Sequence, residues 1–125
     1  MDEVFEKGAA MRRAVVGAAY VERASADPFT QPLQELLTRF CWGSVWSREG
    51  LPPKTRSLLT LVLLAALGKP NELRLHTAGA LRNGCTVDEI REALLHATVY
   101  LGFPAGIEAF RNASEALKEA GAIPR

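Results

Sequence analysis

Residues 53–84 read PKTRSLLTLVLLAALGKPNELRLHTAGALRNG, and this stretch decides the fold of the chain. Pro53 and Pro70 each suit the first turn of a helix, where a proline has no hydrogen bond to lose. Gly68 and Asn83-Gly84 suit the position just after a helix end, where the backbone turns. The stretch therefore predicts two helices joined by a short link.

The first of these two helices is unusually apolar. From Leu58 to Leu67, nine of ten residues are apolar, and Thr60 is the exception. A helix that is apolar on every side has to be covered on every side. Either it is the central helix of the core, or a second copy of the chain covers one side of it, since large exposed apolar patches are rare on monomers. The small size of the chain favours a homo-oligomer.

Similar helix punctuation runs through the rest of the sequence, whereas strand signals are weak. Thr86 and Glu89 form a capping box, in which each residue's side chain bonds the backbone of the other. We predict one all-α domain over residues 1–125 with about six helices joined by short links. The four further helices are expected at about 2–23, from 27–28 to 41 or 46, 86–102 and 104–121.

Composition and charge exclude several classes of protein. Fifteen Lys+Arg stand against fourteen Asp+Glu and are scattered, which argues against a nucleic-acid partner or a polybasic membrane anchor. The N-terminus has no signal-peptide pattern, and the longest apolar run is too short to cross a bilayer. Cys41 and Cys85 form no CxxC pair, so we expect inert thiols rather than a disulfide or a redox motif. We expect a cytoplasmic protein without a membrane partner.

Glu72 and His76 form the best candidate for chemistry. They are four residues apart, so on a helix they lie on one face, and such a pair can pass a proton between groups of different basicity. The plain alternative is an ordinary surface pair. His96 lies in an apolar run, where a histidine is more often a core residue. A metal site built from these three residues has no recognised spacing to support it, so we expect no metal.

Three arginines lie beside apolar helical segments, namely Arg39, Arg56 and Arg74. Each can pair with a carboxylate, reach out to water, or clamp a carboxylate ligand. Arg56 lies at the start of a helix, where a cation opposes the helix dipole, and this misfit predicts a nearby anion. Arg12-Arg13 is expected to be solvated or to bridge subunits.

Aromatic residues offer a second, weaker signal. Trp42 and Trp46 are four residues apart and predict an aromatic face, which is more often packing than the wall of a ligand pocket. Tyr100 precedes a tight turn between helices and can offer its hydroxyl to a cavity.

Six short motifs in this order and spacing resemble the carboxymuconolactone decarboxylase family, which is related to alkyl hydroperoxidase D. The motifs are Met11–Gly17 (MRRAVVG), Arg39–Trp46 (RFCWGSVW), Arg56–Leu58 (RSL), Glu72–His76 (ELRLH), Asn83-Gly84 and Tyr100–Ala105 (YLGFPA). The resemblance covers nearly the whole chain. It implies an alkyl hydroperoxidase D-like helical fold, a ring-like homohexamer and no cofactor.

The resemblance also implies an activity. The family reaction is the decarboxylation of 4-carboxymuconolactone (2-carboxy-2,5-dihydro-5-oxofuran-2-acetate) to 3-oxoadipate enol-lactone and CO2, in the β-ketoadipate pathway of aromatic catabolism. On this basis His76 is expected to donate the proton, and Glu72 to orient it or share the proton. The residues expected to contact the lactone dicarboxylate are Arg56, Arg39, Trp46, Tyr100 and His96.

Some positions depart from the family pattern or bear on rival functions. Lys69 and Glu72 stand where peroxidase members carry cysteines, so the thiol nucleophile is missing there. Ala18 and Phe40 stand where the family often has a polar residue, and Cys41 stands where it commonly has alanine, so the substrate can be a related lactone or carboxylic acid. The two rival functions are a hydroperoxidase-like antioxidant redox protein and a non-enzymatic helical oligomer.

Overall fold

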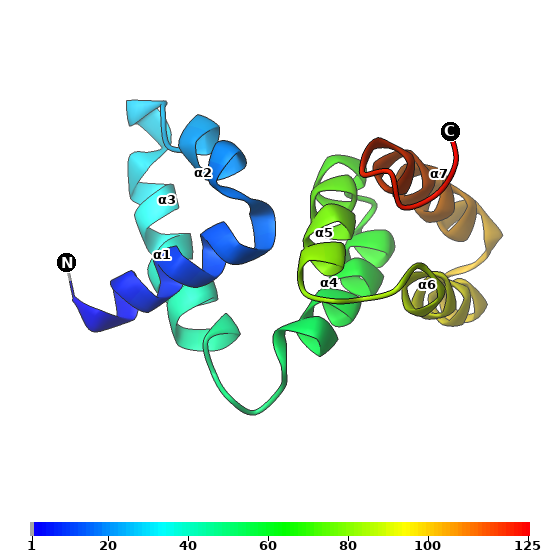
Figure 1. Ribbon diagram of the computed structural model, residues 1–125, viewed down its shortest axis with the longest axis horizontal. Helices are drawn as coiled ribbons and strands as arrows, with labels where there is room; N and C mark the ends of the chain where they lie inside the picture. The colour runs from blue at the N-terminus through cyan, green and yellow to red at the C-terminus, as the bar shows by residue number, and fades with distance from the viewer. Residues whose placement is uncertain (1) are drawn as a thin grey trace. The chain divides into compact units, whose positions relative to one another are not determined.

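The computed structural model describes residues 2–125, and within them the chain is helical without any strand (Figure 1). The all-α prediction is therefore confirmed, with seven α-helices in the described residues where about six were expected. The chain forms two compact units, one ending at Pro53 and the other running from Lys54 to Arg125. The assignment of residues 1–125 to one domain stays a prediction.

The first unit is built from short helices. They are α1 (Glu3–Val16), α2 (Ala18–Ala24), a 3-10 turn η1 (Pro28–Thr30), α3 (Gln31–Leu37) and a π-helix η2 (Thr38–Trp46). The single helix predicted over 2–23 is wrong, because Gly17 adopts a φ of 89° and separates α1 from α2. The helical segment predicted from Asp27 to Trp46 is confirmed, and the Asp27 side chain accepts a hydrogen bond from the Phe29 N–H at 3.0 Å. Its final π-helical part was not predicted.

Two glycines allow α1 and η2 to cross in backbone contact. A Cβ atom on Gly8 would lie 2.1 Å from the Thr38 carbonyl oxygen, and one on Gly43 would lie 2.5 Å from the Val4 carbonyl oxygen. Neither position has room for a side chain, because the atoms it would meet belong to the backbone. The crossing fixes which residues of α1 face α3 and η2.

The second unit contains four longer helices with the predicted punctuation. They are α4 (Pro53–Leu67), α5 (Pro70–Arg82), α6 (Val87–Leu101) and α7 (Phe103–Glu119). Gly68 follows α4 with a φ of 67°, as its role as a helix stop requires. The capping box at the start of α6 is confirmed, since the Glu89 N–H donates to Thr86 Oγ1 at 3.0 Å and the Thr86 N–H donates to Glu89 Oε1 at 2.8 Å.

The core of this unit leaves one face of α4 uncovered. The buried core draws on α4, α5, α6 and α7, and its largest fully buried side chains are Leu61, Leu73, Ile90 and Leu94. Leu59, Leu63 and Leu67, one turn apart on α4, are each at least half exposed. The helices of the second unit therefore do not cover α4 on every side, and α4 is not the central helix of this unit. Cover by a second copy remains the open alternative.

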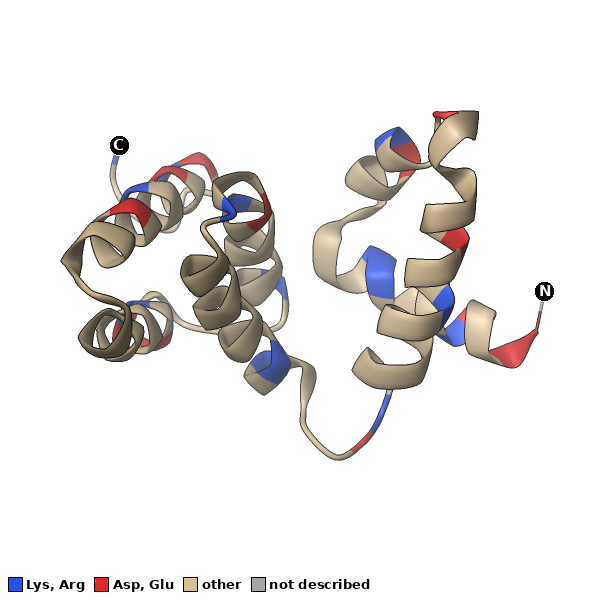
Figure 2. Cartoon of the chain, turned by 180° about the vertical axis from the view of Figure 1, so that it is seen from behind, with Lys and Arg blue, Asp and Glu red and all other residues tan. Residues whose placement is uncertain are grey.

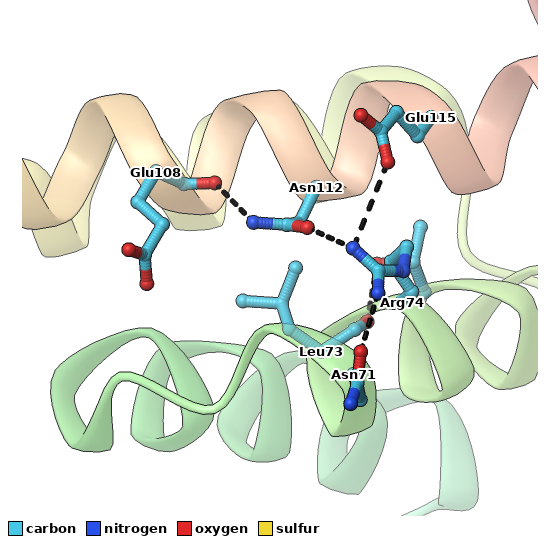
Figure 3. A network of polar contacts seen from close by, with 7 residues as sticks. Asn71, Leu73, Arg74, Glu108, Asn112 and Glu115 are labelled. Carbon is cyan, nitrogen blue, oxygen red and sulfur yellow. Dashed lines mark hydrogen bonds and ion pairs between the residues drawn. The ribbon is translucent and has the colours of Figure 1, made fainter.

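Arg74 links α5 to α7 through polar contacts (Figure 3). Its guanidinium donates to Asn112 Oδ1 on α7 and to Asn71 Oδ1 on its own helix, and it lies 3.6 Å from the Glu115 carboxylate. The Asn112 amide in turn donates to the Glu108 carbonyl at 2.9 Å. Of the three uses predicted for this arginine, pairing within the protein is the one the structure shows.

Acidic and basic residues are interspersed over both units (Figure 2). Neither sign forms an extended patch on the helices of residues 2–125, as the scattered charges of the sequence predict. Among these same residues, no helix has both the length and the apolar character that a membrane span requires.

Candidate active site

Glu72 and His76 lie on one face of α5, as predicted. Pro70 and the backbone of Lys69 start this helix, so Glu72 falls in its exposed first turn and His76 one turn further along. His76 is mostly shielded, and its Nδ1 atom is out of reach of solvent. The negative charge of Glu72 acts on the imidazole and favours its protonated form. The structure thus brings the two side chains together with one exposed and the other largely buried.

Burial dominates the protonation of His76. It lowers the pKa of the imidazole from its ordinary 6.5 to about 4, and the opposing effect of Glu72 is smaller. At neutral pH the ring is therefore uncharged in the resting protein. A neutral imidazole both donates a hydrogen bond from one nitrogen and accepts one at the other. Such a ring can stabilise developing negative charge or take up a proton.

Arg56 occupies the first turn of α4, in the same unit as the acid–imidazole pair. Its carbonyl accepts a hydrogen bond from Thr60 Oγ1 at 2.8 Å, and its Nε atom is shielded from solvent. The guanidinium of Arg56 is therefore partly withdrawn from water. This differs from the predicted alternative in which the arginine reaches out to water. Its contact with a substrate carboxylate stays a prediction.

Arg39 and Trp46 belong to η2 in the other unit. Arg39 is exposed, pairs with the Asp2 carboxylate and lies 5.8 Å from the centre of the Phe5 ring. The Trp42 and Trp46 rings pack against each other with centres 4.8 Å apart and planes tilted by 35°, and both side chains are buried. The aromatic face predicted from their spacing is therefore confirmed. Substrate contact by Arg39 or Trp46 stays a prediction.

His96 and Tyr100 also form a pair, on α6. Their ring centres are 5.3 Å apart with planes tilted by 43°. His96 is exposed, so the interpretation of His96 as a core residue is wrong: α6 buries Ile90, Leu94 and Ala97 on its inner face and carries His96 on the outer one. Tyr100 is 77% exposed. Contact of His96 and Tyr100 with substrate stays a prediction.

Other reactive side chains give little support to redox or metal chemistry. Burial raises the pKa of both cysteine thiols, and Cys85 is further affected by the charge of Glu89. Both cysteines are free, and they lie in different units. A raised pKa means less thiolate, which agrees with the prediction of inert thiols. Within residues 2–125, no three His, Cys, Asp or Glu side chains gather closely enough to hold a metal ion.

Sequence reasoning missed the environment of Arg12. It was expected at a solvated or subunit-bridging position, but its side chain is only 5% exposed. Nη2 of Arg12 donates to Gln34 Oε1 at 2.6 Å, and Nη1 donates to Thr38 Oγ1 at 3.3 Å. One signal was present in the sequence. Gly8 lies one helical turn before Arg12, and a glycine there lets α1 approach η2 closely enough to bury that face.

Comparison with known sequences places the chain in a family. The profile of the carboxymuconolactone decarboxylase family matches residues 31–118, which is well over half of the chain. The chain belongs to this family. The matched residues include Arg56, Glu72 and His76, whereas α1 and α2 lie outside them.

Two curated relatives in the carboxymuconolactone decarboxylase family are informative. The chain is 41% identical to 4-carboxymuconolactone decarboxylase from Acinetobacter baylyi over 125 residues, which covers 98% of this chain and 93% of the relative. It is 54% identical to nitrosuccinic acid decarboxylase from Metarhizium robertsii over 108 residues, which covers 85% of this chain and 76% of the relative. Both relatives carry the name of a decarboxylase, although their substrates differ.

Proposed function

We propose that this protein is a carboxy-lyase that decarboxylates 4-carboxymuconolactone to 3-oxoadipate enol-lactone and CO2. The observation that carries the proposal is the neutral, shielded imidazole of His76 one helical turn from the carboxylate of Glu72. Family membership and a near full-length relative with this activity support the choice of reaction. The same resemblance places the reaction in aromatic catabolism through the β-ketoadipate pathway.

The chemistry of this substrate suits a site without an added electron sink. The carboxylate that leaves is attached to the ring carbon beside the ring oxygen, and the ring double bond joins that carbon to the lactone carbonyl. When CO2 departs, the electron pair spreads through the double bond to the carbonyl oxygen. The protein has to hold two carboxylates, stabilise the charge on that oxygen and deliver one proton to the carbon next to the carbonyl.

We assign these tasks to named residues. Arg56, with Arg39, binds the carboxylates, and Trp46, Tyr100 and His96 complete the walls of the pocket. His76 acts on the carbonyl end of the substrate, where its N–H donates a hydrogen bond as negative charge develops. These contacts are proposals that rest on residue type, burial and the family resemblance.

The low pKa of His76 refines its role as the proton donor. A ring that is neutral at pH 7 holds no spare proton before substrate arrives. A dianionic substrate next to Glu72 adds negative charge, which raises the pKa of the imidazole and lets it take up a proton. The protonated ring then delivers that proton to the carbon, and the product leaves with one carboxylate and one enol-lactone ring. Glu72 orients the ring or shares the proton.

A direct assay tests this proposal. Purified protein is mixed with 4-carboxymuconolactone without added metal, and CO2 release and loss of lactone absorbance are followed. His76→Ala should lower turnover by at least roughly 100-fold, the usual scale for loss of a general acid. Glu72→Gln is measured in the same assay. Its control is Glu119→Gln, which removes an exposed carboxylate at the end of α7. A loss below threefold in His76→Ala would remove this residue from the mechanism.

The second relative supports one alternative substrate, nitrosuccinate, because its identity to this chain is 54%. This molecule also has two carboxylates, and the carbon that loses CO2 carries the nitro group. The electron pair left behind is held by that group as a nitronate, and protonation of the carbon gives 3-nitropropanoate. The demands on the protein are the same as for the lactone: two carboxylates, one developing charge and one proton.

The exposed residue Phe40 and the partly buried Cys41 lie on η2, and the family resemblance implies that position 40 is commonly His or Tyr and position 41 commonly Ala. This difference bears on which of the two substrates is used. The kcat/KM values for 4-carboxymuconolactone and nitrosuccinate, measured on one preparation, decide between them. A ratio of at least roughly 100 in either direction assigns the substrate, since this corresponds to about 2.7 kcal/mol of transition-state discrimination.

We further propose that the protein is cytoplasmic and assembles as a homohexamer. Support for the assembly comes from the exposed leucines of α4. It also comes from a second apolar surface at the α6–α7 turn, formed by Leu95, Val99, Phe103 and Ile107. Apolar surfaces of this kind are normally covered. Light scattering should give six times the 13.6 kDa of one chain. Leu63→Glu should lower that mass, whereas Glu119→Gln should leave it unchanged.

A further inference from the structure

Arg12 is a buried cation held by neutral groups. Its side chain is 5% exposed, and its two hydrogen-bond partners are the amide oxygen of Gln34 and the hydroxyl of Thr38. Burial lowers the pKa of the guanidinium, so its surroundings disfavour the charge. Among residues 2–125, no aspartate or glutamate forms an ion pair with it. A buried charge normally has an opposite charge beside it, because desolvation is otherwise costly.

The guanidinium also has unused hydrogen-bonding capacity. An arginine carries five N–H donors, and the bonds to Gln34 and Thr38 account for two of them. Three donors remain, and two neighbouring N–H groups of a guanidinium can meet both oxygens of a carboxylate. Gln34 and Thr38 hold the fork in place, and the backbone crossing at Gly8 holds the turn of α1 from which Arg12 projects.

Arg12 lines a cavity in the first unit. This cavity has a volume of about 290 Å³, and its polar walls include Arg12, Arg13, Ser25, Gln31, Gln34 and Glu35. That space corresponds to roughly ten water molecules and suits a small organic acid. The second arginine adds positive charge, while Glu35 adds one negative charge to the wall. The planar fork of a guanidinium matches the two oxygens of a carboxylate.

We propose that this cavity is a carboxylate-binding site in which Arg12 forms the ion pair and Arg13 meets a second charge if the ligand has one. The ligand class is a small mono- or dicarboxylic acid. The site goes beyond the proposed role of Glu72 and His76, and it is built from α1, α2 with its C-cap Ser25, α3 and the start of η2. Its ligand has two possible sources, the substrate itself or a separate organic acid.

The experiment measures binding without relying on turnover. Thermal unfolding of the full chain is followed with increasing succinate against sodium chloride at equal ionic strength. A ligand at about 100 times its dissociation constant should raise the melting temperature by about 10 °C. Arg12→Lys, which keeps the charge but loses the fork, should lose most of this rise. Arg23→Lys on the exposed end of α2 makes the same change at the surface and should keep it.

A second measurement needs no variant to fold. The side-chain Nε–H signal of Arg12 in the wild-type protein should shift on titration with succinate and reach saturation, while that of Arg23 stays in place. Absence of both the saturable shift and the thermal effect would overturn the proposal. Both effects would be absent, for example, if a carboxylate from another chain filled the cavity. A thermal rise that survives in Arg12→Lys would overturn it as well.

Kinetics then identify the source of the ligand. If the bound acid is the substrate, Arg12→Lys raises KM by at least roughly tenfold and succinate inhibits competitively. If a separate acid binds, KM stays within twofold and only the succinate-dependent stability is lost. Because the binding measurements contain no turnover step, failure of the carboxylate site and failure of the proposed decarboxylase activity give different results.

Discussion

Lowering the pH should destabilise the protein through His76. The pKa of this imidazole is about 4 in the folded protein and 6.5 in an exposed chain, so the unfolded state binds its proton first. The stabilisation is therefore complete above pH 6.5 and is lost as the pH falls from 6.5 towards 4. The difference between the two pKa values predicts a loss of about 2 kcal/mol in the free energy of unfolding by pH 5 and about 3 kcal/mol by pH 4.

Urea unfolding at a series of pH values measures this effect, with ionic strength and protein concentration held constant. Asp2 and Glu89 also contribute in this range, because hydrogen bonds and paired cations lower their pKa values. The informative quantity is therefore the difference between wild type and His76→Gln. The variant should lose about 2 kcal/mol less than wild type between pH 7 and pH 5. His96→Gln on the exposed face of α6 is the matched control and should follow wild type.

A second measurement on the wild-type protein checks the same reasoning. The imidazole signal of His76 in an NMR titration should change well below pH 6 if burial controls its protonation. A midpoint near 6.5, together with equal pH dependence in wild type and His76→Gln, would show that the ring is solvated. In that case the argument for a neutral imidazole in the resting site fails.

Two further predictions concern packing. Gly8→Ala should destabilise the protein by at least about 2 kcal/mol, because its Cβ would meet the backbone of Thr38, whereas Gly50→Ala meets nothing within 4 Å and should be nearly neutral in urea unfolding. Leu61→Ala should cost about 2 to 5 kcal/mol because Leu61 is 0% exposed, while Leu61→Met, which keeps the volume, should cost less than about 1.5 kcal/mol in the same assay.

Helix boundaries were predictable wherever the sequence contains a residue with a strong local preference. Pro53, Pro70 and the capping box at Thr86 mark starts correctly, and Gly68 marks an end, because each acts through the backbone of its own turn. The break at Gly17 was underestimated, because one continuous helix was predicted through this residue. A glycine inside an otherwise helical pattern is tolerated or breaks the helix according to its φ, and the pattern alone does not fix that angle.

The candidate site was only partly predictable. Spacing places Glu72 and His76 on one face of a helix, because that relation is local. Burial of Arg12 and exposure of His96 depend on which face of each helix meets a neighbour far away in the sequence, and residue spacing holds little information on that. The π-helix at Thr38–Trp46 also depends on packing against α1, where Gly8 and Gly43 meet.

The anchoring of α5 by Arg74 has a consequence for the acid–imidazole pair. Residues two apart on a helix point in nearly opposite directions, so Arg74 faces away from both Glu72 and His76. Through its contacts with α7, Arg74 fixes the rotation of α5 about its own axis. This rotation sets the direction in which the imidazole of His76 points. Under the proposed mechanism, substitutions on α7, such as at Asn112, therefore change the reaction without touching any reacting atom.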